Sequence, residues 1–443
     1  MSHYKPYPVY KDSEVEWIGE VPEHWGVKPI KVIASCNDDS LPESIPSDAQ
    51  IRYVDISAVS HDEGISGAEP MVFGEAPSRA RRKAKVGDVV VSTVRTYLKA
   101  LASVDEAHAD CVYSTGFAVL RARREQLAPE FLKWLALNDL LIQAVESHSE
   151  GLSYPAINAS ELVNLKAVVP SLPEQRRIAS VLDRETARID VLVSKKTRFI
   201  ELLKKKRQAL ITRAVTKGLD PDVKMKDSGV EWIGEVPEHW MAAPIKYVGR
   251  LESGHTPSRS VPAYWENCTV PWFTLADIWQ VRKAGRKVIT ETSEMVSELG
   301  LANSSARRLP SGTVVLSRTA SVGFPAILGC EMATSQDFAA WICGKRLHNE
   351  FLYFCLIAMK GELNRLMMGS THKTIYMPDI EQFRCTLPPI SEQCQIAVYI
   401  QNQIDRFQQL TEKTQHSIDL LKKRRSAFIT AAVTGKIDLR ESV

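Results

Sequence analysis

Residues 11–31 read KDSEVEWIGEVPEHWGVKPIK, and residues 226–246 read KDSGVEWIGEVPEHWMAAPIK. The second copy follows the first by 215 residues, which is close to half of the 443-residue chain. Self-similarity over such a period is the signature of a repeated architecture. The sequence therefore predicts that one structural frame is built twice, as a pseudo-twofold internal repeat.

A second match lies near the end of each half and has an ungapped offset of 218 residues. It pairs EQRRIASVLD at 174–183 with EQCQIAVYIQ at 392–401, and IELLKKKRQALITRAVT at 200–216 with IDLLKKRRSAFITAAVT at 418–434. The intervening inserts, residues 32–170 and 247–387, barely resemble each other. A constant frame with two different inserts predicts two recognition elements for two different targets, held at a fixed separation.

The composition is that of a soluble globular protein, with 44% hydrophobic and 25% charged residues. Length alone predicts two or three domains. No run of about 18 apolar residues is present and no apolar core of a secretion signal is visible, so we expect neither a membrane segment nor export. The eight cysteines include no CxxC pair, which argues against a zinc ribbon or a disulfide framework and suits the cytoplasm.

The net charge of +3 is too small to identify a nucleic-acid-binding protein by itself. Its distribution is more informative, because local basic clusters could neutralise phosphates. These clusters are RARRKAK at 79–85, KKTR at 195–198, KKKR at 204–207 and KKRR at 422–425. Each cluster could equally be the solvated face of a helix, so both interpretations stay open.

Residues 174–216 are predicted to form one long helix, because no proline or glycine interrupts them, while Pro173 suits its start and Gly218 its stop. Apolar residues recur there, and in the matching stretch 392–434, at the spacings of a heptad. Polar residues interrupt each seam, so we expect the two helices to pack on each other as an antiparallel coiled coil. Packing of each helix on its own globular domain is the alternative. The predicted seam residues are Ile178, Leu182, Ile189, Leu192, Phe199, Leu203, Leu210, Ile396, Ile400, Phe407, Leu410, Leu421 and Phe428.

Each insert has about 140 residues, which suits one compact domain of mixed α/β structure. The inserts share a faint skeleton, in which a strand ends in Ser or Thr beside an arginine, a long apolar helix follows, and a polar segment closes the domain. Strands are predicted at 86–94, 117–122, 270–275 and 312–317, helices at 129–147 and 349–368, and closing segments at 147–158 and 369–380.

Together these features resemble the specificity subunit of Type I restriction-modification systems. The resemblance is carried by WIGEVPEHW at 17–25 and 232–240, by the LPEQ and SEQ helix openings at 172–175 and 391–393, and by the tails KKKRQALITRAVTKGLD at 204–220 and KKRRSAFITAAVTGKID at 422–438. The segment GSTHKTIYMPDIEQF also looks like the end of that family's target recognition domains. The resemblance covers the whole chain and its order of parts.

The resemblance implies a non-catalytic, cytoplasmic DNA-binding subunit without a cofactor or a metal. It implies two target recognition domains, residues 1–170 and 221–387, each opening with its copy of the repeated segment. These domains alternate with two helical spacers, residues 171–220 and 388–443. Such a subunit reads a bipartite, asymmetric sequence in double-stranded DNA. It directs two methyltransferase (M) subunits and two restriction/translocase (R) subunits to that sequence.

Sequence reading needs donors and acceptors held against base edges, mostly in the major groove, with separate contacts to phosphates. Polar and cationic side chains in Gly-flanked loops can make both kinds of contact, although an ordinary loop role is the alternative for each. The candidates in the first insert are Arg79, Arg81, Arg82, Arg95, Thr96, Tyr97, Lys99, Ser153 and Tyr154. The candidates in the second are Thr256, Ser258, Arg259, Arg318, Thr371, His372, Lys373, Thr374 and Tyr376. The first insert lacks a lysine where Lys373 stands, so its closing segment departs from the family pattern.

The repeated segments each carry two tryptophans, Trp17 and Trp25 in the first, Trp232 and Trp240 in the second. We expect them to be structural corners where each insert meets a helix end. The alternative is a docking surface for an M subunit, because tryptophan is enriched in binding hot spots.

An intrinsic enzyme and a tandem scaffold for proteins are the competing function classes. The Asn/Asp-Pro-Pro-aromatic motif of an adenine methyltransferase and the GxxxxGK[ST] loop of a motor are both absent. Asp379 and Glu381 faintly resemble a nuclease motif, but Gln382 and Phe383 follow where a lysine is needed. A scaffold that binds only proteins would show no salt-dependent affinity for DNA.

Overall fold

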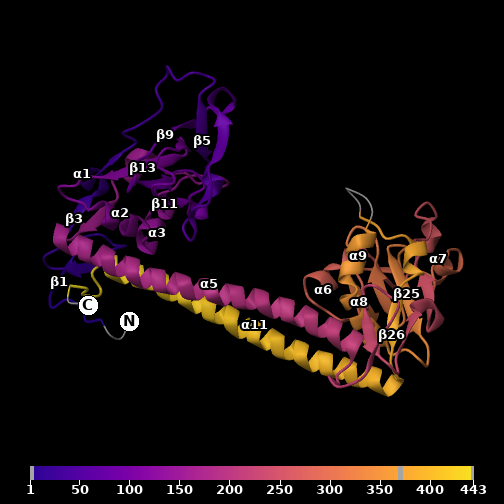
Figure 1. Cartoon of the computed structure of the whole chain (residues 1–443). Helices are drawn as coiled ribbons and strands as arrows, with labels where there is room; N and C mark the ends of the chain where they lie inside the picture. The colour runs from indigo at the N-terminus through magenta and orange to yellow at the C-terminus, as the bar shows by residue number, and fades with distance from the viewer. Residues whose placement is uncertain (1–3, 368–372, 441–443) are drawn as a thin grey trace. The chain divides into compact units, whose positions relative to one another are not determined.

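The computed structural model, drawn in Figure 1, describes residues 4–367 and 373–440. Two helices dominate it, α5 (Leu172–Lys217) with 46 residues and α11 (Ile390–Val433) with 44 residues. Both helices begin two residues before the predicted starts, because a proline such as Pro173 is tolerated in a first turn, where its missing N–H is not needed. α5 ends one residue after the predicted 216, and α11 ends one residue before the predicted 434. Both helices stop at a glycine with a left-handed backbone, Gly218 with φ +75° and Gly435 with φ +74°.

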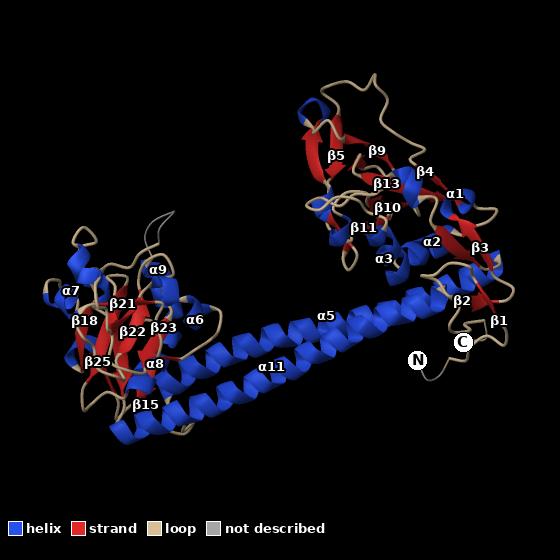
Figure 2. Ribbon diagram, turned by 180° about the vertical axis from the view of Figure 1, so that it is seen from behind, coloured by secondary structure: helices blue, strands red, loops and turns tan. Residues whose placement is uncertain are grey.

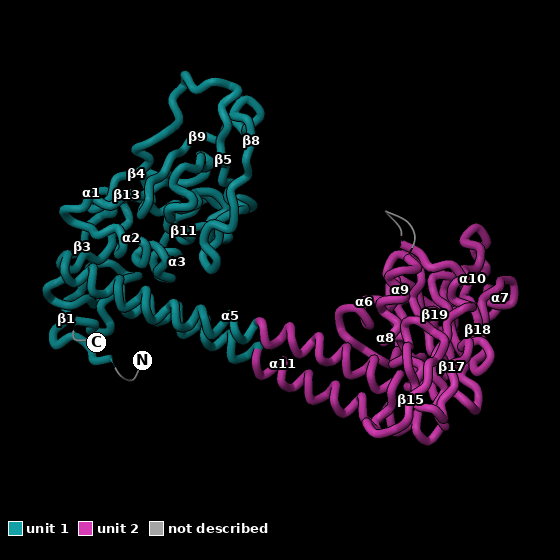
Figure 3. Tube along the Cα trace, viewed as in Figure 1, with its two compact units in different colours: residues 1–197, 415–443 teal, residues 198–414 magenta. Residues whose placement is uncertain are grey.

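The chain forms two compact units, and each unit joins one insert to a section of both long helices. Unit 1 comprises residues 1–197 and 415–443, and unit 2 comprises residues 198–414 (Figure 3). The four segments predicted from the sequence (1–170, 171–220, 221–387 and 388–443) follow the order of the repeat along the chain. The two compact units instead group residues that contact one another in space. Each unit is therefore described by itself below.

Within each unit, the start of one long helix packs beside the end of the other, as Figure 2 also shows. The residues that share the core of unit 1 are Ile178, Ala179 and Leu182 of α5 with Phe428, Ile429 and Val433 of α11. Those that share the core of unit 2 are Ile211, Ala214 and Val215 of α5 with Ile396, Ala397 and Ile400 of α11. The predicted antiparallel packing of the two helices is thereby confirmed.

Most of the predicted seam residues are buried or half-buried, but Leu192, Phe199 and Leu410 are each nearly half-exposed. Their assignment to the seam is corrected, since Ile200 and Ile404 are buried nearby instead. The physical reason is that a straight helix turns once in 3.6 residues, so its buried face drifts away from a strict seven-residue count.

The first insert is built on two sheets, one antiparallel and one mixed. One has the strand order β11 (Leu101–Ser103), β10 (Val89–Ser92), β13 (Phe117–Ala122) and β4 (Ala34–Cys36), and the other has the order β8 (Glu69–Val72), β5 (Gln50–Val54), β12 (Val112–Ser114) and β9 (Ala80–Lys83). β5 and β12 run parallel, whereas the other neighbours are antiparallel. Helices α2 (Pro129–Ala136) and α3 (Asp139–Ser147) contribute to the same core as β10 and β13.

The second insert repeats this plan with a different sequence. Its larger sheet has the order β18 (Gly249–Ser253), β25 (Phe338–Cys343), β22 (Val314–Ser317), β23 (Pro325–Leu328) and β20 (Val288–Ile289). Its smaller sheet has the order β21 (Glu294–Val296), β19 (Val270–Phe273) and β24 (Ala333–Thr334), with β19 and β24 parallel. The predicted mixed α/β inserts are confirmed.

The helix predicted in each insert is in fact two helices. The first breaks at Asn138, whose side chain accepts a hydrogen bond from the backbone N–H of Leu140 and so caps α3. The second breaks at Met359, between α8 (Asn349–Ala358) and α9 (Lys360–Leu366). An apolar periodicity predicts helical residues but does not reveal a sharp turn between two helices.

The repeated segment of the first half forms a corner around Trp25, which is completely buried. Gly435 follows the end of α11, and a β-carbon at this position would lie only 3.1 Å from the ring of Trp25. The neighbouring His24 Nε2 lies 3.1 Å from Glu174 Oε2, at the start of α5. This corner therefore holds the beginning of one long helix and the end of the other.

The second corner repeats these contacts with the helices exchanged. Trp240 is completely buried, and a β-carbon at Gly218, after α5, would lie 3.2 Å from its ring. His239 Nε2 lies 3.0 Å from Glu392 Oε2 at the start of α11. The burial of both tryptophans supports a structural role for them over a docking surface.

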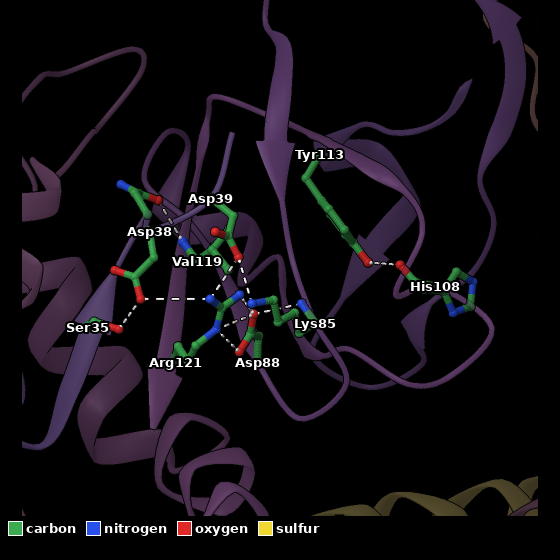
Figure 4. Close-up of polar contacts among 10 residues, drawn as sticks. Ser35, Asp38, Asp39, Lys85, Asp88, His108, Tyr113, Val119 and Arg121 are labelled. Carbon is green, nitrogen blue, oxygen red and sulfur yellow. Dashed lines mark hydrogen bonds and ion pairs between the residues drawn. The ribbon is translucent and has the colours of Figure 1, made fainter. Parts of the chain in front are cut away.

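One ion-pair cluster belongs to the first insert alone (Figure 4). Arg121 on β13 donates from Nη2 to Asp88 Oδ2 at 2.7 Å and from Nη1 to Asp39 Oδ2 at 2.8 Å. The hydrogen bonds to Asp88 raise the pKa of Arg121, and the hydrogen bond from Arg121 lowers the pKa of Asp39. The cluster connects the loop after β4 and the loop before β10 to strand β13. In the second insert, the position on β25 that corresponds to Arg121 is occupied by Ile342.

Candidate nucleic-acid interface

In the first insert, four segments that are distant in sequence meet at one edge. The backbone N–H of Ile157 donates to Thr93 O at 2.9 Å, and that of Thr93 donates to Gly116 O at 2.8 Å. The backbone N–H of Thr115 donates in turn to Arg79 O at 2.7 Å. We name the surface formed by residues 79, 93–99, 114–116 and 149–157 the first loop edge.

The second insert repeats the first two of these three backbone hydrogen bonds. Ile375 donates to Arg318 O at 2.9 Å, and Arg318 donates to Asp337 O at 2.8 Å. A further bond joins His255 N to Thr334 O at 3.1 Å. We name residues 254–259, 317–320, 334–337 and 373–376 the second loop edge. The two edges therefore share a backbone frame although their sequences differ.

Each edge begins where a central strand ends in a buried serine, Ser92 on β10 and Ser317 on β22. Three residues later the chain adopts a left-handed backbone, with φ +51° at Arg95 and φ +57° at Ala320. Such conformations are uncommon for residues other than glycine and tend to mark functional loops. In both inserts this turn lies at the strand-end motif of Ser or Thr beside an arginine.

Cationic and aromatic side chains project from the first loop edge. The Arg95 guanidinium lies 4.8 Å from the ring centre of Tyr154, and both residues are exposed, as are Tyr97 and Ser153. Lys99 is exposed, with Nζ 3.9 Å from a Glu146 carboxylate oxygen. Arginine beside an exposed aromatic ring offers both charge for phosphates and a stacking surface for bases.

One protein-family model and several known proteins are similar to this chain. The family model described as "Type I restriction modification DNA specificity domain" matches residues 237–420. The MjaX specificity subunit of a type I restriction enzyme from Methanocaldococcus jannaschii is 24% identical over 96% of each chain. The MjaVIII specificity subunit of the same organism is 25% identical over 67% of this chain and 68% of its own.

Over almost its whole length, the chain is therefore similar to specificity subunits of Type I restriction-modification systems. The fold agrees with solved structures of similar proteins. The structure of the HsdS subunit from Thermoanaerobacter tengcongensis covers 94% of this chain, with 24% identity and a TM-score of 0.56. A chain from a structural study of type I complex assembly and conformational transition also covers 94%, with 24% identity and a TM-score of 0.73.

No helix in the described part of the chain is long and apolar enough to span a membrane. Within residues 4–367 and 373–440, none of the eight cysteines forms a disulfide.

In the structure, the residues of the basic cluster at 79–85 lie in two different environments. Arg79 lies on the first loop edge, whereas Arg81 and Arg82 lie on β9 and are half-buried. The Arg81 guanidinium lies 5.0 Å from the ring centre of Phe73. Of the two interpretations left open for this cluster, a helix face is excluded, because the residues form a strand.

Thr96 does not reach the surface of the first loop edge. Its side chain is buried, and its hydroxyl donates to Ser149 Oγ at 2.8 Å. The expectation that Thr96 contacts DNA is therefore corrected, since the hydroxyl is used to join two segments of the edge.

The candidates of the second insert are placed less uniformly. Arg318 is half-buried and donates from Nη1 to Ile375 O at 3.4 Å. Ser258, Arg259, Lys373 and Tyr376 are exposed, while Thr256 and Thr374 are half-buried. The predicted contacts Thr371 and His372 lie outside the described residues.

Sequence reasoning missed the acidic residues that organise the edges. Asp337 accepts hydrogen bonds from Thr319 and Ser335 and so joins two segments of the second edge. Asp55 and Glu294 each pair with a candidate arginine. No local motif marks these acids, because each has at least one partner that lies 18 or more residues away in the sequence.

Proposed function

We propose that this chain acts as the specificity subunit of a Type I restriction-modification system and reads a bipartite, asymmetric sequence in double-stranded DNA, with one loop edge for each half-site. The observation that carries the proposal is that one backbone frame displays different side chains in the two inserts. Arg95 in the first edge corresponds to Ala320 in the second, and Thr93 corresponds to Arg318. Different donors on the same frame suit two different half-sites, because base identity is read through the pattern of donors and acceptors.

We further propose that the two long helices set the number of base pairs between the half-sites. At 1.5 Å per residue, the 46 residues of α5 correspond to about 69 Å of helix. A continuous helix transmits a fixed length between the segments at its ends, so the gap would be a constant of the protein.

The exposed apolar residues of the helices support two copies of one partner, which we propose to be the M subunit. Leu192 and Leu410, related by the repeat, are 46% and 44% exposed, and Leu202 and Leu420, also related, are 49% and 53% exposed. A single exposed leucine needs no explanation. Recurrence of both at equivalent positions indicates two equivalent binding surfaces, as pseudo-twofold symmetry requires. Two R subunits would complete the complex.

DNA binding in the presence of the M subunit tests the main proposal. We expect electrophoretic mobility shifts with a duplex that contains the target, and an affinity that falls steeply as salt rises. Binding to partner proteins without any salt-dependent DNA affinity would instead favour a protein-only scaffold.

The number of M subunits per chain tests the proposed docking surfaces. In unit 1, the double variant Leu192→Glu and Leu420→Glu should lose one of two M subunits, measured by native mass spectrometry. Leu299→Glu is the matched control, because Leu299 is 50% exposed but lies in the second insert. A double variant that still binds two M subunits would remove these leucines from the interface.

A further inference from the structure

Each insert places one aromatic side chain at an equivalent position of its smaller sheet. β5 pairs in parallel with β12, where Tyr53 faces Val112, and β19 pairs in parallel with β24, where Trp272 faces Ala333. β12 and β24 both lead directly into a loop edge. Tyr53 and Trp272 are therefore structural counterparts beside the proposed reading surfaces.

In both inserts an arginine is fixed against this aromatic residue and beside a carboxylate. Arg79 donates from Nε to Tyr53 Oη at 3.1 Å, and its Nη2 lies 3.2 Å from Asp55 Oδ2. The hydrogen bond to Tyr53 and the charge of Asp55 raise the pKa of Arg79. Its side chain is nevertheless 54% exposed.

Arg259 is held in the same manner by residues of the second insert. Its guanidinium carbon lies 3.7 Å from the ring centre of Trp265 and 5.5 Å from that of Trp272, and its Nη2 lies 2.8 Å from Glu294 Oε2. The Trp265 indole donates to Ser258 O at 3.1 Å, which anchors the stack to the loop. The Arg259 side chain is 59% exposed.

The repeat does not explain this likeness, because the two arginines come from different places in their inserts. Arg79 precedes β9, whereas Arg259 follows β18. Stability does not explain it either, since exposed ion pairs contribute little to folding. The shared feature is a rigid, exposed guanidinium. Within the described residues, Nη1 of neither arginine has a hydrogen-bond partner.

The neighbouring carboxylates decide which part of DNA these arginines suit. A phosphate carries negative charge, so Asp55 or Glu294 at about 3 Å from the guanidinium would repel it. The major-groove edge of guanine is uncharged and offers two adjacent acceptors, O6 and N7, which match the guanidinium fork. Adenine replaces one of these acceptors with an amino donor, which an arginine cannot satisfy.

We propose that Arg79 and Arg259 each read a guanine in the half-site of their own insert, with Asp55 and Glu294 as positioning residues. The inference rests on the proposed function, because it requires that each insert reads its own half-site. It adds the identity of one base in each half-site and the side chain that specifies it.

The test is single-molecule sequencing of modified adenines in cells that express the full chain with its M subunit. The wild-type motif should contain a required guanine in each half-site. Arg259→Ala should make one guanine of the second half-site degenerate, with a loss of roughly 5- to 150-fold in preference, and leave the first half-site unchanged. Arg79→Ala should do the reverse.

Arg308→Ala is the matched control in the second insert. Arg308 is exposed and pairs with Glu298 and Glu331, but it makes no aromatic contact and lies outside the loop edge. Its loss should leave the motif unchanged. Arg259→Gln keeps a long polar side chain but removes the guanidinium fork, so it should relax the same guanine, and it guards against misfolding of the alanine variant.

Three outcomes would overturn the inference. One is a bipartite wild-type motif without a guanine in the second half-site, which leaves the proposed function intact. Another is an Arg259→Ala variant that keeps the motif while binding to all sequences weakens, as loss of a phosphate contact would. The third is full guanine preference in Arg259→Gln. A wild-type protein that yields no bipartite motif would contradict the proposed function itself.

Discussion

At the scale of the residue, a buried glutamine ties each insert to a long helix. Gln393 is completely buried, its Oε1 accepts from His348 N at 2.8 Å, and its Nε2 donates to Arg346 O and Pro388 O at 2.9 and 2.8 Å. Gln175 makes the equivalent three bonds in the first half. A buried amide with every group satisfied is stabilising, and its loss leaves several backbone groups without partners.

We therefore expect Gln393→Leu to destabilise unit 2 by about 3 kcal/mol, because one N–H and two carbonyl groups lose their hydrogen bonds. Gln408→Leu is the control, since Gln408 is exposed on the same helix. Its cost should be below about 0.5 kcal/mol. Thermal unfolding measures both variants, and equal melting temperatures would show that the glutamine does not hold the insert.

Lys373 provides a second prediction at this scale. It is exposed on the second loop edge, where its carbonyl accepts from Ala320 N at 2.9 Å. Lys373→Ala should weaken DNA binding and lower the steepness of its salt dependence by about one charge. Lys345→Ala, an exposed lysine of the same insert outside the edge, should leave the slope unchanged. A slope unaffected by Lys373→Ala would remove this lysine from the interface.

The residue scale is also where sequence reasoning failed most often. It selected Arg79 and Arg259 by their chemistry but could not find Asp55 or Glu294, which hold them. It placed Thr96 on the surface because hydroxyl groups suit DNA, while the fold uses that hydroxyl internally. Such assignments depend on contacts between residues that are distant in sequence, which composition and periodicity do not contain.

At the scale of the element, the two long helices were predicted closely, because an uninterrupted, repeated stretch leaves few alternatives. The shorter helices of the inserts were predicted as single elements, although each breaks in two. The seam was predicted in part. Its central positions were misassigned because the exposed leucines Leu192 and Leu410 satisfy the heptad spacing as well as the buried residues do.

Helix length gives a prediction at this scale. Four residues inserted after Thr197 and four after Gln415, positions related by the repeat, would lengthen both helices by about 6 Å and keep their pairing in register. Four residues are slightly more than one turn, so the seam is only mildly rotated. The half-sites should stay the same while the gap grows by one or two base pairs, measured by sequencing modified adenines. Methylation only at the original spacing would show that the helices do not measure the DNA.

At the scale of the whole molecule, the repeat predicted that one frame is built twice. The structure adds that the frame continues into the inserts, because the two loop edges share two equivalent backbone hydrogen bonds. The sequence could not reveal this, since backbone bonds leave little trace in the identity of the side chains. A shared frame with exchangeable surface residues explains how two inserts can differ in sequence yet perform one task.

The exchange of one insert tests this account most directly. Residues 247–383 would be replaced by the equivalent insert of a relative, ending before β26 (Arg384–Leu387), because β26 pairs with β17 (Met241–Pro244) of the frame. Modified adenines would then be mapped by single-molecule sequencing in cells that also express the M subunit. We predict a bipartite motif in which only one half-site changes, while the other half-site and the gap remain. A hybrid in which both half-sites change would contradict independent reading by the two inserts.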